Sequence, residues 1–115
     1  MQFVYRRADL SLTMRTQKAL MERLTSQPLT TLGGQKVTEV GRKDGLKLYL
    51  DHNNWVLIRP SGTEPLIRLY FECSSVDKVE RVMKDFNQQI EAILSEIDRE
   101  AAKENGAGIK TAARH

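Results

Sequence analysis

The segment WVLIRPSGTEPLIRLYFEC, residues 55–73, places two runs of strand-forming residues on either side of a loop. β-Branched, aromatic and aliphatic residues dominate both runs, which predicts strands at 55–58 and 65–73. The loop holds two prolines, a glycine and two hydroxyl residues, which are typical of turns. A plain hairpin needs little special chemistry in its loop. This loop, with an arginine at each end, is more elaborate than a turn requires.

Two further strands are predicted upstream. KVTEVGR (36–42) and LKLYL (46–50) flank an Asp44-Gly45 pair, which is a strong hairpin signal. In the second of these runs leucines alternate with other residues, which indicates one buried face. The short connections favour an antiparallel meander of four strands.

One predicted helix precedes this meander in the sequence and another follows it. Apolar residues at helical spacing predict a first helix over 13–26, ended by Pro28. A longer apolar stripe at three- and four-residue steps runs from 76 to 97, after a serine pair suited to cap a helix. The expected fold class is therefore α+β in two layers. A four-stranded antiparallel sheet carries two helices on one face and leaves the other face open.

The chain of 115 residues suits one domain. We expect an interdomain linker or lead-in at 1–12, the domain at 13–101, and a flexible tail at 102–115. The pattern fades in the tail, where glycines interrupt it.

Composition excludes several classes of protein. No apolar run is long enough for a membrane span, and the N-terminus does not read as a secretory signal. Cys73 is the only cysteine, so there is no disulfide framework, and its place on the apolar side of its strand predicts a buried, unreactive thiol. The net charge of +3 is spread among interleaved acids and bases, unlike the basic face of a nucleic-acid binder. A cytoplasmic protein with no membrane and no nucleic-acid partner is expected.

The backbone of the loop is suited to an anion. Pro60 fixes its own φ and Pro65 restarts the strand, while Gly62 is free to adopt a positive φ. In a tight turn of this kind, successive N–H groups converge into a nest that attracts negative charge.

The side chains of the loop add hydrogen-bond donors. Ser61 and Thr63 supply hydroxyls, and Arg59 and Arg68 supply guanidinium groups that match phosphate oxygens in a bidentate manner. Alternation along the last strand directs Arg68 to the open face. The set suits a phosphate monoester. The alternative is an ordinary loop in which Glu64 pairs with one of the arginines.

WVLIRPSGTEPLIRLYFEC closely resembles the signature of the C-terminal domain of the α-D-phosphohexomutases, which include phosphoglucomutases and phosphomannomutases. Asp44-Gly45, Trp55 and the long second helix also fit this family. The resemblance covers roughly residues 10–100. Such enzymes have four domains around a cleft, and the resemblance implies that this chain is the fourth only, a small α+β domain likened to the TATA-binding-protein fold.

The resemblance also implies the roles of the loop residues. In the family, a phosphoserine and a Mg²⁺ site lie in other domains, and the loop of the fourth domain holds the substrate phosphate that is not being transferred. The phosphate contacts carried over are Arg59, Ser61, Gly62, Thr63 and Arg68; the residues that shape the loop are Pro60, Glu64 and Pro65. This chain is then an excised or partial domain that has no catalytic residue, binds no metal or cofactor and is inactive alone. Its partners are a sugar phosphate and the missing domains.

Three alternatives remain open. The sugar is not chosen by the loop, so phosphoglucosamine or phosphoacetylglucosamine mutase stands beside the favoured phosphoglucomutase or phosphomannomutase type. A non-enzymatic anion-binding or nucleic-acid-binding module is the second, although fold likeness alone does not carry function. The third is an assembly module that uses the long helix.

Overall fold

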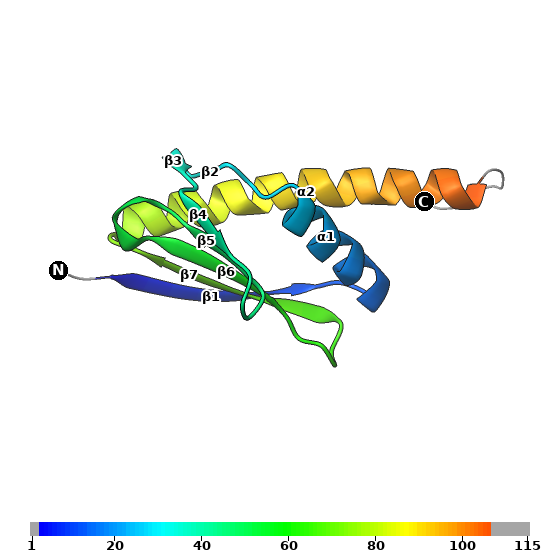
Figure 1. The fold of residues 1–115 in the computed structure, drawn as a ribbon, viewed down its shortest axis with the longest axis horizontal. Helices are drawn as coiled ribbons and strands as arrows, with labels where there is room; N and C mark the ends of the chain where they lie inside the picture. Colours follow the sequence, from blue (N-terminus) through cyan, green and yellow to red (C-terminus); the bar gives the residue numbers. More distant parts are fainter. Residues whose placement is uncertain (1–2, 107–115) are drawn as a thin grey trace.

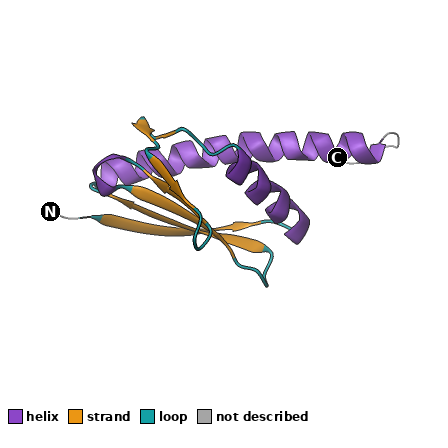
Figure 2. Cartoon of the chain, in the orientation of Figure 1, coloured by secondary structure: helices purple, strands orange, loops and turns teal. Residues whose placement is uncertain are grey.

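The structure is a computed structural model that describes residues 3–106. The elements, in order, are β1 (Val4–Ser11), α1 (Met14–Ser26), β2 (Thr31–Leu32), β3 (Gln35–Lys36), β4 (Glu39–Gly41), β5 (Leu46–Tyr49), a 3-10 turn (Asp51–Asn53), β6 (Trp55–Pro60), β7 (Leu66–Cys73) and α2 (Val76–Gly106). Five strands form one antiparallel sheet in the order β1-β7-β6-β5-β4, and β2 pairs with β3 in a small hairpin (Figure 1). Both helices lie on the same side of the sheet (Figure 2), which confirms the α+β class.

The expected count of four strands is wrong, because the sheet has a fifth. The strand β1 is formed by residues that we expected to be a lead-in, and it pairs antiparallel with β7. Its register places Val4 opposite Cys73 and Ser11 opposite Leu66. As a result β7, which carries Arg68, lies between two neighbouring strands instead of at the edge of the sheet.

The expected strand at 36–42 is divided. Lys36 ends β3, and only Glu39–Gly41 belong to β4. Between them, the N–H of Val37 donates to the carbonyl of Thr30 and the N–H of Thr38 donates to that of Tyr49. The two residues therefore bond to different parts of the chain. The remainder of the predicted meander, from β4 through β7, is confirmed.

Both helices begin at hydroxyl caps. The Thr13 side chain accepts the N–H of Thr16 at 3.1 Å, and the Ser75 hydroxyl accepts the N–H of Lys78 at 3.1 Å. The first helix ends as predicted, whereas α2 continues to Gly106, past the point where we expected a tail. The rest of that expected tail, 107–115, lies outside the described residues. In the described part of the chain, no helix is both long and apolar enough to cross a membrane.

The core lies between the helices and one face of the sheet. Along β7 burial alternates strictly, so that every second side chain, from Ile67 to Cys73, points into the core. The rings of Phe71 on β7 and Phe86 on α2 pack edge to face with centroids 5.6 Å apart. Cys73 is fully buried, as expected, and this burial raises the pKa of its thiol to about 11. The same alternation places Arg68 and Tyr70 on the open face.

Candidate functional site

The loop between β6 and β7 is short and closed by the backbone. Arg59 lies directly opposite Arg68 in the register of the two strands, and Pro60 lies opposite Ile67. Beyond this pair, the N–H of Ser61 donates to the carbonyl of Leu66 at 3.1 Å. The sheet therefore fixes both ends of the loop, and both arginines arise from its open face.

Gly62 adopts φ +89° at the tip of the loop. A Cβ atom built at this position would have no heavy atom within 4 Å. Glycine is therefore favoured here by backbone conformation and not by lack of space. The positive φ that the sequence predicted for this residue is confirmed.

Glu64 connects Ser61, at the start of the loop, with Arg68 on β7. One carboxylate oxygen, Oε1, accepts a hydrogen bond from Nη2 of Arg68 at 3.1 Å and one from the hydroxyl of Ser61 at 3.5 Å. Its backbone N–H donates to the same Ser61 hydroxyl at 3.2 Å. Of the two arginines with which Glu64 was able to pair, it pairs with Arg68. Among the described residues no ion pair involves Arg59, which is exposed.

A cavity of about 330 Å³ lies over the loop. It is lined by Arg59, Pro60, Ser61, Thr63, Glu64, Arg68 and Tyr70. The structure thus brings together four of the five predicted contact residues around one space, and Gly62 shapes the loop without lining it. Tyr70 was not predicted as a site residue. The sequence allowed this residue to be predicted, because Tyr70 follows Arg68 by two positions and therefore lies on the same face of the strand.

Strand β1 adds charged residues near this cavity. Asp9 lies directly opposite Arg68, and Arg7 lies opposite Tyr70. The guanidinium of Arg7 lies 5.9 Å from the centre of the Tyr70 ring, within the range of a cation–π contact. Residues 1–12 are expected from the sequence to be a linker, and the pairing of β1 with β7 is what brings Asp9 and Arg7 to this face.

The loop rests on the first helix. The amide nitrogen Nε2 of Gln17, a residue only 4% exposed, donates to the backbone carbonyl of Glu64 at 3.4 Å. The N–H of Leu12 donates to the carbonyl of Pro65 at 3.0 Å. These bonds hold the far side of the loop, which leaves its hydroxyls and arginines facing outward. Gln17 lies on the same face of α1 as the buried Leu20 and Leu24. A polar residue at a position where the helical spacing predicts an apolar one was the feature from which its role could have been inferred.

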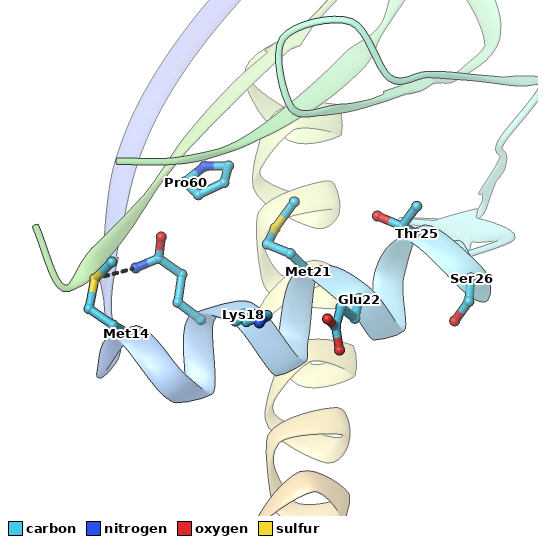
Figure 3. Close-up of a pocket in the computed structure, with 8 residues that line it drawn as sticks. Met14, Lys18, Met21, Glu22, Thr25, Ser26 and Pro60 are labelled. Atoms are coloured by element: carbon cyan, nitrogen blue, oxygen red, sulfur yellow. Dashed lines mark hydrogen bonds between the residues drawn. The ribbon is translucent and has the colours of Figure 1, made fainter. Parts of the chain in front are cut away.

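A second cavity, of about 680 Å³, lies between α1 and the end of β6. Met14 and Met21 project from α1 on the side of Pro60 (Figure 3). Pro60 lines both cavities. Its lining also includes Lys18, Thr25 and Ser26, but only the first cavity combines two guanidinium groups with two hydroxyls of one loop. The first cavity is therefore the better suited to phosphate.

The described residues hold no group of three or more histidine, cysteine or acidic side chains placed to bind a metal ion. The Mg²⁺ site that the family resemblance implies is expected in another domain, not among these residues.

The fold is a small two-layer α+β domain that presents an arginine pair on the open face of its sheet, across a Pro-Ser-Gly-Thr loop. The chain belongs to the family described as "Phosphoglucomutase/phosphomannomutase, C-terminal domain", whose sequence profile matches residues 16–89. That match confirms the resemblance and includes the whole loop.

Similar sequences carry two kinds of name. A probable phosphoglucosamine mutase of Methanopyrus kandleri is 36% identical over 59 residues, which is 51% of this chain and 13% of that protein. A phosphoglucomutase/phosphomannomutase of Thermococcus kodakarensis is 38% identical over 53 residues, 46% of this chain and 11% of its own length. A probable phosphoglucosamine mutase of Thermococcus gammatolerans is 27% identical over 99 residues, 86% of this chain and 20% of that protein. The chain thus spans about a fifth or less of these relatives.

The fold has a counterpart among crystal structures. A phosphoglucomutase/phosphomannomutase family protein from Burkholderia thailandensis superposes with a TM-score of 0.61 at 25% identity. The match covers 80% of this chain and 18% of that protein. The similarity therefore concerns one domain of a much larger molecule.

Proposed function

We propose that the loop from Arg59 to Arg68 binds the phosphate group of a sugar phosphate. The observation that carries the proposal is the cavity in which two cross-strand arginines, two hydroxyls and a tyrosine meet. Guanidinium groups bind phosphate oxygens through paired, charge-assisted hydrogen bonds. The loop lies within the segment that matches the mutase family, which supports a phosphate over other anions.

The parent enzyme is proposed to interconvert hexose 1-phosphates and hexose 6-phosphates through a phosphoserine and a bisphosphorylated intermediate. In such a reaction this domain holds the phosphate that is not being transferred. Binding energy from a nonreacting group lowers the barrier only if it also positions the reacting end. Two arginines fixed by adjacent strands suit this role, because the sheet sets their separation. The isolated chain binds the phosphate group and does not catalyse the reaction.

The phosphoglucomutase or phosphomannomutase type remains the favoured reaction, with phosphoglucosamine or phosphoacetylglucosamine mutase as the alternative. Relatives bear both the first name and that of phosphoglucosamine mutase. All these substrates share a phosphate group, so the proposed phosphate site does not choose among them. Activity of the full-length protein on the phosphates of glucose, mannose, glucosamine and N-acetylglucosamine separates the alternatives.

The test of phosphate binding is a ¹⁵N NMR titration of the chain with glucose 1-phosphate, with glucose as the control. We expect shifts in the amides from Arg59 to Arg68 with the phosphate and none with glucose. Affinity in the millimolar range, about −4 kcal/mol, is expected for a site without its neighbouring domains. Equal shifts with glucose, or shifts elsewhere on the chain only, contradict the proposal.

A further inference from the structure

Two of the groups proposed to bind phosphate are already bonded to an acid of the same loop. The Arg68 guanidinium and the Ser61 hydroxyl both donate to oxygen Oε1 of Glu64, at 3.1 and 3.5 Å. A phosphate oxygen in this cavity would seek the same two donors. Both line the cavity, and so does Glu64.

We propose that the Glu64 carboxylate is a built-in competitor of the phosphate, which occupies one oxygen position of the anion site and must leave when a ligand binds. This inference rests on the proposed function. It assigns Glu64 a part in setting affinity, beyond the shaping of the loop.

The hydroxyl of Ser61 is the reason why the Glu64 carboxylate must leave before a phosphate takes its place. A serine hydroxyl has a single proton to donate, and that proton is directed to Glu64. A phosphate accepts it only after Glu64 has released it. Arg68 has several N–H groups and is able to reorient, but a carboxylate and a phosphate that share its fork repel each other.

The structure permits the carboxylate to leave while the loop stays in place. The Glu64 side chain is 55% exposed, so it is able to turn into water. Its backbone is held independently, because the carbonyl accepts bonds from the N–H of Leu66 at 2.7 Å and from Gln17 at 3.4 Å. The movement required is therefore a side-chain rotation.

The test measures the affinity of the chain for inorganic phosphate by NMR in the wild type, Glu64→Gln and Glu72→Gln. The amide keeps the shape of Glu64 and removes its charge. Glu72 is the matched control, because it lies on the same face of β7 as Arg68 and makes no ion pair with any described residue. We expect Glu64→Gln to bind phosphate about twofold to fivefold more tightly, the range that a partly exposed ion pair supports. Glu72→Gln should stay within about twofold of the wild type.

A second readout follows the carboxylate itself. In the wild type, the ¹³C resonance of the Glu64 carboxyl carbon should move on saturation with phosphate, while that of Glu72 stays unchanged. If Glu64→Gln binds phosphate equally or more weakly and the carboxyl resonance does not move, Glu64 supports Arg68 and the inference is overturned.

Arg59→Ala separates this failure from failure of the site. If the wild type binds phosphate and Arg59→Ala does not, the site is real, and the Glu64 result alone decides the inference. If the wild type does not bind phosphate, or if Arg59→Ala binds it as well as the wild type, the proposed function fails and the inference fails with it.

Discussion

Arg59 and Arg68 are direct cross-strand partners on the open face of the sheet. Like charges in directly opposed positions of an antiparallel pair are unfavourable. Glu64 offsets the charge of Arg68 only, through a half-exposed ion pair. The hairpin thus has an arrangement that does not favour its own stability, which agrees with the anion-binding role proposed for these two residues.

Arg59→Ala should therefore leave the fold intact while it removes phosphate binding. We expect the free energy of unfolding to stay level or rise by about 0.5 kcal/mol, because a like-charge pair is relieved. Phosphate affinity should fall roughly tenfold or more, since a hydrogen bond to a charged group contributes about 1.5–3 kcal/mol. Urea unfolding and NMR titration give the two values. Arg99→Ala on α2 is the control, because Arg99 is exposed and makes no ion pair with any described residue. A loss of stability specific to Arg59→Ala would mean that Arg59 is structural.

Gly62→Ala tests the role of the loop tip, and Gly34 provides a matched control. The two glycines have φ values of +89° and +83°, and neither has a heavy atom within 4 Å of a built Cβ. Each substitution should cost about 1–2 kcal/mol of stability through the same backbone strain. Only Gly62→Ala should weaken phosphate binding, because Gly34 lies in the β2–β3 turn. Equal phosphate affinity in the two variants would show that the tip geometry does not shape the site.

Gly45 contributes to the same site from a different turn. A Cβ at this residue would lie 2.5 Å from the carbonyl oxygen of Ile58 and 3.2 Å from Cα of Arg59, at φ +115°. Gly45→Ala should destabilise the chain by about 2–4 kcal/mol, since strain and overpacking add. The strand that carries Arg59 must shift, so phosphate affinity should fall as well. Urea unfolding of Gly45→Ala beside Gly34→Ala checks this, and equal losses would rule out the clash.

The sequence predicted the helices and the meander because their signals are local. Helix caps, apolar stripes and the Asp44-Gly45 turn each lie within a few residues of the element they define. The strand β1 had no such signal. Arg6 stands at an inward-facing position between Val4 and Ala8, which interrupts the apolar alternation. Its partner strand lies more than fifty residues away, so the pairing is set by tertiary structure.

The same distinction applies to the site. The loop residues were predicted because they are contiguous and chemically distinctive. Gln17 bonds to the loop from α1, and Arg7 contacts the ring of Tyr70 from β1; a linear pattern does not show which distant elements will meet. Glu64 was seen as able to pair with either arginine, and only the side-chain geometry selects Arg68.

Asn54 lies between the 3-10 turn and β6 and is fully buried. Its side-chain oxygen accepts the N–H of Ser74 at 2.9 Å, and its Nδ2 donates to Oε1 of Gln35 at 2.7 Å. One carboxamide thus joins β3 to the junction between β7 and α2. A buried polar network of this kind is stabilising only while its members are paired.

Asn54→Ala should lower the free energy of unfolding by about 2–3 kcal/mol, because it leaves the Ser74 N–H without its partner. Asn87→Ala, at an exposed position on α2, should change it by less than about 0.5 kcal/mol. Hydrogen exchange at the Ser74 amide gives a site-specific check, since its protection should be lost in Asn54→Ala and kept in Asn87→Ala. Unchanged protection at Ser74, with a stability loss below about 0.5 kcal/mol, would show that the network does not anchor α2 to the sheet that carries the loop.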